Sequence, residues 1–166
     1  PSSAASDVYK RQRDERPMFA YPFKGYWKDV GTIESLWEAN MDLLREGNEL
    51  DLYDDDWKIF SANSVSSAQY IGAEAKVRNC LLSEGCTIHG NVENSVLFQG
   101  VSVGKNCIIK NSVIMPNVKI GDNVIIDKAI VGDSVKIKKD SIIGDGSEIE
   151  VVASGRGRKE ELLDVI

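Results

Sequence analysis

The sequence predicts a mainly β protein whose body is a stack of coils, each built from three short strands, with one α-helix before the stack. Three observations predict this class. Similar segments follow one another from Val77 to Val152, aliphatic residues recur near every sixth position within each segment, and an earlier stretch has the three-and-four spacing of a helix. Repeats of this kind are typical of solenoids, in which each unit packs only on its neighbours.

The repeat can be written in register. Its first four segments read VRNCLLSEGCTIHGN, VENSVLFQGVSVGKNCI, IKNSVIMPNVKIGDNVI and IDKAIVGDSVKIKKDSI, so the first has 15 residues and the next three have 17. IGDGSEIEVV begins a fifth. The aligned aliphatic columns are Val77, Val92, Ile109, Ile126 and Ile143; Leu81, Val96, Val113 and Ile130; Cys86, Val101, Val118 and Val135; and Ile88, Val103, Ile120 and Ile137.

The columns indicate how each coil is built. We expect each side of a coil to direct one main aliphatic residue inward, while Gly, Asn and Asp take the corner torsions that other residues avoid. Asn79, Asn94 and Asn111 would then form a corner ladder, which Lys128 interrupts. Each buried aliphatic side chain contributes about 1.5–3 kcal/mol, so stacked coils can be stable where one coil cannot.

The helix is predicted from Thr32, a residue suited to cap it, to Gly47, a residue suited to stop it. Its apolar stripe consists of Ile33, Leu36, Trp37, Asn40, Met41, Leu43 and Leu44. The chain then divides into 1–12, a disordered or non-native segment; 13–47, the loop and helix; 48–69, a connector; 70–152, the coils; and 153–166, a tail.

Composition and charge narrow the function classes. The net charge is -6 and no Lys/Arg stripe appears, which argues against a nucleic-acid partner. No apolar run reaches the roughly 18 residues of a membrane span, and we expect a cytoplasmic protein that does not contact membranes. The acidic run Asp54, Asp55 and Asp56 could hold a metal or could be solvated turn surface.

The cysteines and the single histidine are candidate reactive groups. Cys80 and Cys86 share columns with small or aliphatic residues, and we expect all three cysteines, with Cys107, to be packing residues. Their odd number and spacing suit a reducing compartment. His89 falls in the column of Gly104 and Gly121, a corner that we expect to face solvent.

The repeat resembles the hexapeptide-repeat left-handed parallel β-helix, and the resemblance implies the left hand. Two groups of proteins carry such a prism. Acyltransferases bind coenzyme A and use a catalytic histidine, for which His89 is the one candidate in this sequence. Sugar-nucleotide enzymes instead attach the prism to a nucleotidyltransferase domain.

The segment YPFKGYWKDVGTIESLWEANMDLL, residues 21–44, resembles the end of the catalytic domain in the glucose-1-phosphate adenylyltransferase family. The likeness continues through QYIG, residues 69–72, and ENSVLFQGVSVG, residues 93–104, into the prism. It implies a bacterial catalytic-subunit type in which the loop and helix are the last part of an α/β nucleotidyltransferase domain. The reaction implied is ATP plus glucose 1-phosphate to ADP-glucose plus pyrophosphate, assisted by Mg²⁺, in glycogen or starch synthesis.

The resemblance also assigns roles within WKDVGT. It implies that Asp29 lies at the sugar-phosphate and metal end of the pocket, where a carboxylate can bind Mg²⁺ or a sugar hydroxyl. Lys28 could bind a phosphate or be solvated. Tyr26 and Trp27 are expected to pack between the loop and the helix rather than to stack on a sugar.

The rest of the family's site, a glycine-rich nucleotide loop and further catalytic residues, belongs to an upstream domain. SGRGRKEE, residues 154–161, lacks the spacing of a phosphate-binding loop. We therefore expect a fragment of an adenylyltransferase that is inactive alone, and whose prism mediates tetramer contacts and helps to form an effector site. The alternative is a stand-alone hexapeptide-repeat module that oligomerises or acts as an acyltransferase.

Overall fold

The computed structural model describes residues 19, 21–47, 50–56 and 66–153. Within these residues lie one α-helix and thirteen strands. The bounds are α2 Ile33–Asp42, β1 Tyr70–Ile71, β2 Val77–Leu82, β3 Thr87–Ile88, β4 Asn91–Leu97, β5 Ser102–Val103, β6 Ile108–Lys110, β7 Val113–Ile114, β8 Lys119–Ile120, β9 Ile125–Asp127, β10 Ala129–Val131, β11 Lys136–Ile137, β12 Ile142–Ile143 and β13 Glu150–Val152.

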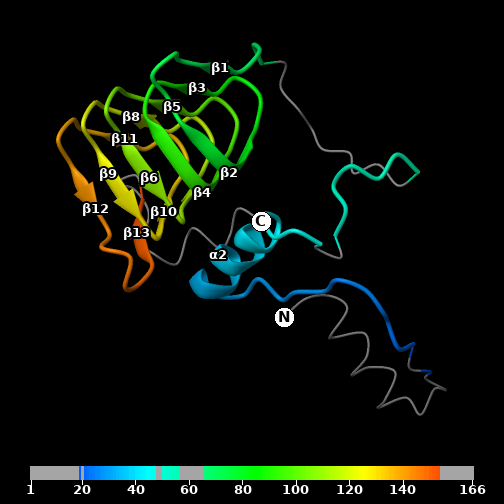
Figure 1. The fold of residues 1–166 in the computed structure, drawn as a ribbon. Helices are drawn as coiled ribbons and strands as arrows, with labels where there is room; N and C mark the ends of the chain where they lie inside the picture. Colours follow the sequence, from blue (N-terminus) through cyan, green and yellow to red (C-terminus); the bar gives the residue numbers. More distant parts are fainter. Residues whose placement is uncertain (1–18, 20, 48–49, 57–65, 154–166) are drawn as a thin grey trace.

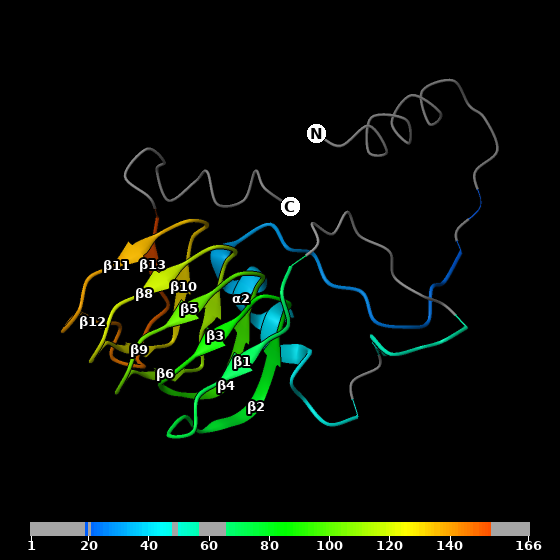
Figure 2. The ribbon, with the colours of Figure 1, turned by 90° about the horizontal axis from the view of Figure 1, so that it is seen from above.

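The strands form a three-sided prism in which every pairing is parallel (Figure 1). One side is the five-stranded sheet β1-β3-β5-β8-β11. The other two sides belong to one eight-stranded sheet, because β4 continues through a corner and pairs with β6 on one side of it and with β7 on the other. β2 pairs with β4 along both of these sides. Seen from above in Figure 2, the chain winds around the prism and advances by one coil at each turn. The predicted β-helix is confirmed.

The strand pairing also confirms the predicted register. Val77 pairs with Val92, and the same column continues through Ile109, Ile126 and Ile143. The column that contains Ile88 and Ile120 is paired in the same way. The 15-residue first segment is short at one corner, where His89-Gly90 joins β3 to β4.

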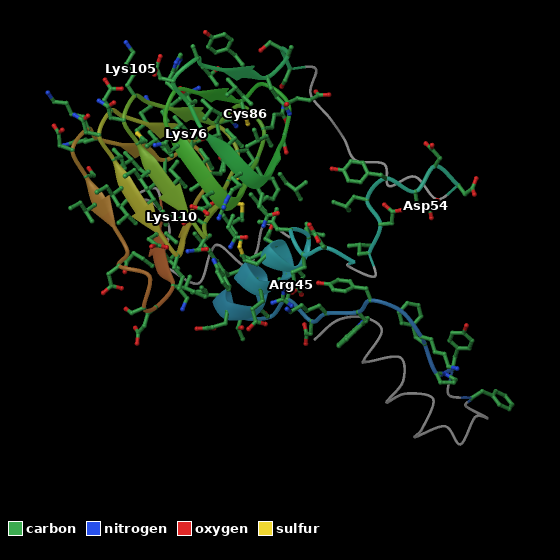
Figure 3. The ribbon with its side chains drawn as sticks, in the orientation of Figure 1. Arg45, Asp54, Lys76, Cys86, Lys105 and Lys110 are labelled. Atoms are coloured by element: carbon green, nitrogen blue, oxygen red, sulfur yellow. The ribbon has the colours of Figure 1, made fainter. Side chains whose placement is uncertain are left out.

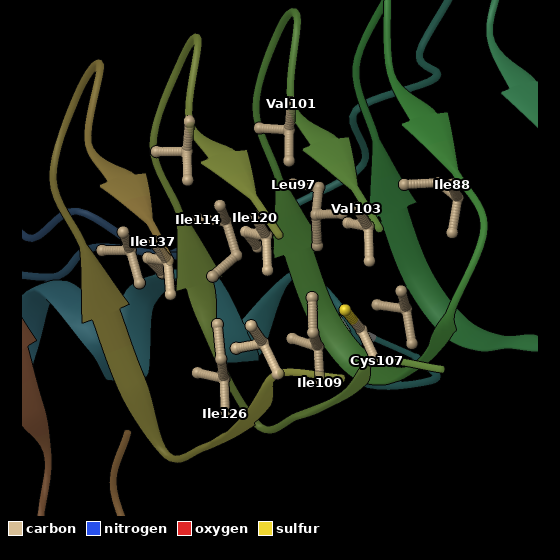
Figure 4. Packing of buried hydrophobic residues seen from close by; sticks show 14 of the residues in the cluster. Ile88, Leu97, Val101, Val103, Cys107, Ile109, Ile114, Ile120, Ile126 and Ile137 are labelled. Atoms are coloured by element: carbon tan, nitrogen blue, oxygen red, sulfur yellow. The ribbon is translucent and has the colours of Figure 1, made fainter. Parts of the chain in front are cut away.

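The core differs from the prediction in one respect. Each side directs two columns inward rather than one, and Figure 4 shows these residues filling the prism. The second column on the β7–β10 side runs through Leu97, Ile114 and Val131. The predicted column of Val96, Val113 and Ile130 instead faces outward and is buried in a second cluster. A 17-residue repeat aligns inner and outer positions equally well, so periodicity alone could not separate them.

The corners are held by residues with positive φ. Asn79, Asn94 and Asn111 have φ of 50°, 47° and 48°, and each side-chain amide donates to the next residue up the stack. The predicted ladder is confirmed and ends where Asn111 donates to Asp127 Oδ1 at 2.9 Å, with Lys128 next in the corner column. A second ladder that the sequence analysis missed runs through Asn106, Asn123 and Asp140.

Helix α2 begins as predicted and ends earlier than predicted. The Thr32 side chain accepts a hydrogen bond from Ser35 N, and the Ser35 hydroxyl accepts one from Thr32 N, which completes a capping box. The last helical residue is Asp42, with Leu43 as the C-cap. Gly47, the predicted stop, has a φ of 74° and lies within the turns that follow the helix.

The outward column is the surface on which α2 packs. Leu36 and Met41 of the helix are buried against Val96, Val113 and Ile130. Trp37 Nε1 donates to Asn111 O at 2.8 Å, so its indole is tied to a corner of the prism. Lys128 Nζ lies 6.0 Å from the centre of the Trp37 ring, within cation–π range. The helix is therefore joined to the prism by burial and by a directed hydrogen bond.

Several predictions about chain organisation concern residues that the structure does not describe. Segment 1–12, and all of the 153–166 tail except Ala153, lie there, as do residues 48–49 and 57–65 of the connector. Among the described residues, no helix is long and apolar enough to cross a membrane.

The register predicts opposite effects for two neighbouring substitutions. Val103 is fully buried, whereas Lys105 is exposed at the next corner. Val103→Asp places an unpaired carboxylate in the core and should lower the free energy of unfolding by several kcal/mol, whereas Lys105→Asp should change it by less than about 0.5 kcal/mol. Thermal unfolding followed by circular dichroism measures both, and equal shifts would contradict the register.

Candidate functional site

The candidate site is the loop of residues 25–32, GYWKDVGT, which runs directly into α2. Its residues alternate in burial. Tyr26, Lys28 and Val30 are half-buried toward the helix, whereas Trp27 and Asp29 are exposed. This is the pattern of an extended segment, whose successive side chains point to opposite sides. One edge of the loop is held by the protein and the other faces outward.

Asp42, in the last turn of α2, holds the inner edge of the loop. Its Oδ2 accepts hydrogen bonds from Lys28 Nζ at 2.9 Å and from Tyr26 Oη at 3.2 Å. Arg45 Nη1 lies 2.8 Å from Oδ1, an ion pair although the geometry is too bent for a good hydrogen bond. Lys28 Nζ also lies 3.1 Å from Glu38 Oε2. We call Tyr26, Lys28, Glu38, Asp42 and Arg45 the Asp42 clamp; Figure 3 shows Arg45 beside the helix.

The clamp perturbs the titration of its members. The hydrogen bond from Lys28 holds the pKa of Asp42 below its ordinary value, although burial alone would raise it. The same hydrogen bond raises the pKa of Lys28. Burial, followed by the negative charge of Asp42, raises the pKa of Tyr26. Both charges of the ion pair are therefore favoured at neutral pH, and the phenol stays protonated as a donor.

The two predicted site residues lie on opposite edges of the loop. The Lys28 ammonium contacts the helix carboxylates, and its side chain remains partly exposed. Asp29 is exposed, and among the described residues no hydrogen bond or ion pair engages it. The expectation that Trp27 packs between the loop and the helix is wrong, because 76% of this residue is exposed on the same edge as Asp29. Tyr26 does contact the helix, through Asp42.

Sequence reasoning missed Asp42 and Arg45. Asp42 is only 8% exposed, yet it follows Met41 of the apolar stripe, and a carboxylate there needs a partner. Glu38 and Asp42 lie one turn apart on the same helix face, which is a signal for a shared cation. The cation, Lys28, comes from 14 residues upstream, and no helical spacing points to it.

The histidine, the cysteines and the acidic run, which the sequence offered as further candidate groups, have surroundings that indicate structural roles. The His89 ring lies 5.6 Å from the Tyr70 ring and is half-buried at its corner. Cys86 and Cys107 are fully buried in the core and Cys80 packs against it, which confirms their packing role. Burial raises the pKa of all three thiols. Asp54 accepts a hydrogen bond from Asp56 N, as in a tight turn. The described residues contain no cluster of three His, Cys, Asp or Glu suited to a metal.

The clamp should make the stability of α2 depend on acid. Because the folded pKa of Asp42 is lowered, its contribution is present above the ordinary carboxyl pKa of about 3.9 and is lost as the pH falls through the folded value. Asp42→Asn should reduce the free energy of opening of α2 by about 1.5–3 kcal/mol at neutral pH. It should also flatten the acid dependence. Amide hydrogen exchange of the helix measures both effects.

Glu38→Gln is the matched control, because the Glu38 side chain is 53% exposed and contacts the same ammonium. Exposed ion pairs contribute less than about 1 kcal/mol, so this variant should keep nearly all of the helix protection. Equal losses in the two variants would show that Asp42 is not the centre of the clamp.

Each of the two parts of the chain matches a known protein family. Residues 61–153, which include the whole prism, match the family described as GlmU-like, C-terminal hexapeptide. Residues 2–46, which include the loop and α2, match the nucleotidyl transferase family. The second match begins within the 1–12 segment that the sequence analysis set aside.

Curated relatives cover both regions together. A glucose-1-phosphate adenylyltransferase of Clostridium botulinum is 68% identical over 149 residues, which is 90% of this chain and 38% of the relative. Proteins of the same name from Clostridium beijerinckii and Clostridium perfringens are each 62% identical, over 87% and 89% of this chain and 36% and 38% of their own lengths. The chain thus spans little more than a third of the relatives it matches. It belongs to the GlmU-like hexapeptide family, and its homologues are glucose-1-phosphate adenylyltransferases.

Proposed function

We propose that this chain is the prism-bearing part of a glucose-1-phosphate adenylyltransferase, which transfers the adenylyl group of ATP to glucose 1-phosphate and releases pyrophosphate. The observation that carries the proposal is the identity of 62–68% to proteins of that name across the loop, helix and prism together. A stand-alone module would need only the prism. The product, ADP-glucose, is the glucosyl donor for glycogen or starch synthesis.

The loop supplies one wall of the active site in this proposal. The Asp42 clamp fixes its inner edge, so Trp27 and Asp29 are presented from a segment that is already ordered. A preordered loop spares binding energy that would otherwise be lost in ordering it. In this proposal Asp29 binds the sugar-phosphate end of the substrate, and its exposure on the fixed loop supports that role.

Mg²⁺ fits Asp29 as one ligand among several. Magnesium in phosphoryl-transfer sites is held by one or two carboxylates together with substrate phosphates and waters, so a single exposed carboxylate on a fixed loop is an appropriate donor. When bound, the ion would neutralise charge on the phosphates during in-line displacement. A hydrogen bond from a glucose hydroxyl is the alternative role of the same carboxylate.

Lys28 has a positioning role in this proposal. A phosphate contact would require its ammonium to leave Asp42 Oδ2 and Glu38 Oε2, each about 3 Å away. That exchange would leave the largely buried carboxylate of Asp42 without the cation that donates to it. The predicted phosphate contact of Lys28 stays a prediction, and the clamp geometry supports the structural role.

The prism supplies self-association in the proposed enzyme. One of its sides exposes a column of isoleucines, Ile108, Ile125 and Ile142, which suits packing against another copy in a closed assembly. We propose a homo-oligomer, with a tetramer as the state implied by the family resemblance.

The first test uses the 166 residues as a purified polypeptide. They carry no glycine-rich nucleotide loop, so mixing them with ATP, glucose 1-phosphate and Mg²⁺ should yield no pyrophosphate. A coupled pyrophosphate assay against a heat-treated sample measures this. Turnover above that control would contradict the assignment of catalysis to a larger protein.

The second test restores the larger protein. A chimera in which this chain replaces the matching 149 residues of the Clostridium botulinum relative should make ADP-glucose. Asp29→Asn in that chimera should lower kcat/KM for glucose 1-phosphate about a hundredfold or more, which is the effect of losing one strong electrostatic contact in a desolvated site. The unfolding midpoint should stay unchanged.

Glu34→Gln is the matched control, since Glu34 is an exposed carboxylate in the first turn of α2, close to the loop in sequence. It should keep near-normal turnover. An inactive chimera would count against the proposed function as a whole. An active chimera whose Asp29→Asn variant turns over normally would remove only Asp29 from the site.

A further inference from the structure

Helix α2 is where the two parts of the chain meet. The helix lies in the segment that matches the nucleotidyl transferase family, and the prism lies in the segment that matches the hexapeptide family. It packs on the side of the prism that contains β7 and β10 (Figure 1). Leu36 and Met41 are buried there. Apolar burial is non-directional, so these two residues hold the helix on the prism without by themselves fixing its rotation.

Trp37 supplies a directed contact between the two parts. Its indole Nε1 donates to the backbone carbonyl of Asn111 at 2.8 Å, across 74 positions of sequence. The acceptor residue is itself held, because the Asn111 side chain accepts from Asn94 at 2.8 Å and donates to Asp127 at 2.9 Å. A hydrogen bond is favourable over a limited range of distance and angle, so this one restricts how α2 can turn on the prism.

The prism departs from its own repeat at this contact. Lys128 occupies the corner position one coil after Asn111, where the preceding coils have asparagine. Its φ of 53° lies in the left-handed region, which is uncommon for a lysine. Its ammonium lies 6.0 Å from the centre of the Trp37 ring and donates to Ser147 O at 2.8 Å. The residue that interrupts the amide ladder is therefore the residue that reaches the indole.

The rotation of α2 determines where the Asp42 clamp lies. Trp37 and Asp42 are about 140° apart around the helix, because successive residues are about 100° apart. Trp37 contacts the prism, whereas Asp42 contacts the loop. An atom about 5–6 Å from the helix axis moves by about 1 Å when the helix turns by about 10°. Because Asp42 holds Tyr26 and Lys28, such a turn would displace the loop.

We propose that Trp37 is a positioning residue for the proposed adenylyl transfer, and that its hydrogen bond to Asn111 sets the place of Asp29 through α2 and the clamp. The inference rests on the proposed function. Trp37 itself touches no substrate: the indole fixes the angle of the helix, and Asp42 of that helix holds the loop that presents Asp29. A displacement of about 1 Å in a reaction site can lower the rate about a hundredfold, so a contact on the prism can affect turnover.

The first experiment needs no activity. Residual dipolar couplings of the backbone amides in the whole chain report the orientation of α2 relative to the prism. Trp37→Phe keeps an aromatic ring beside Lys128 but removes the N–H donor. The couplings of the prism should keep their values, whereas those of α2 should change or shrink through averaging. Unchanged couplings in α2 would overturn the proposal.

The second experiment measures turnover in the chimera described above. At a temperature where the variant is fully folded, Trp37→Phe should lower kcat/KM for glucose 1-phosphate at least about tenfold. Ile120→Val is the matched control, because Ile120 lies inside the prism on β8, and its truncation weakens the core without touching α2. This control should lower the unfolding midpoint comparably and leave kcat/KM unchanged. Equal losses of turnover in the two variants would indicate general destabilisation and refute the positioning role.

A double variant tests the route through Asp29. If Trp37 acts through that carboxylate, Trp37→Phe combined with Asp29→Asn should be about as active as Asp29→Asn alone, because the contact that Trp37 positions is already lost. Losses that multiply would show that Trp37 acts by another route and would contradict the inference. An inactive chimera would count against the proposed function and this inference together. An active chimera whose Trp37→Phe variant turns over normally would overturn this inference alone.

Discussion

The parallel stacking of equivalent positions is the constraint on which the rest of the structure depends. Because each strand pairs in register with the strand one coil away, every side chain meets the side chain of the same column about 4.8 Å above and below it. A column of aliphatic residues then fills the interior, and a column of amides can bond along its length. A buried charge in the same place would face only apolar neighbours.

The corners follow from the same constraint. A chain that turns twice or three times per coil within a few residues needs positive φ, and Asn and Asp tolerate it while offering side-chain hydrogen bonds. The amides of Asn94 and Asn111 show both uses at once. Lys128 adopts the same φ of 53° without an amide, and its ammonium instead bonds Ser147 O. The corner geometry is thus kept where the ladder ends.

The candidate site is linked to this stack by a short series of contacts. The outward column buries Leu36 and Met41, Trp37 bonds the corner carbonyl of Asn111, and Asp42 of the same helix holds Tyr26 and Lys28. No hydrogen bond or ion pair joins Asp29 to the part of the prism that the structure describes. Its position is set by the clamp, and the clamp is set by how α2 sits on the outward column.

Sequence could predict the features that repeat or that follow a local rule. The columns, the corner amides and the Thr32 cap belong to this class. Sequence could not tell that Val113 faces outward, because inner and outer positions share the 17-residue period. It could not pair Lys28 with Asp42, because an extended loop meeting a helix has no characteristic spacing. The exposure of Trp27 followed from the same unseen pairing, since fixing Lys28 and Tyr26 inward turns the residue between them outward.

The three sides of the prism therefore make different contacts, although all three are built from the same repeat. The interior columns of all three sides fill one continuous core, but the outward positions differ: one side is covered by α2, and another exposes isoleucines beside alternating charges. Outward residues are not needed to fill the interior of the prism, so they are free to specify what each side contacts. A repeat that fixes the backbone through its inner columns leaves the outer columns to determine where a helix packs and where a second copy can pack.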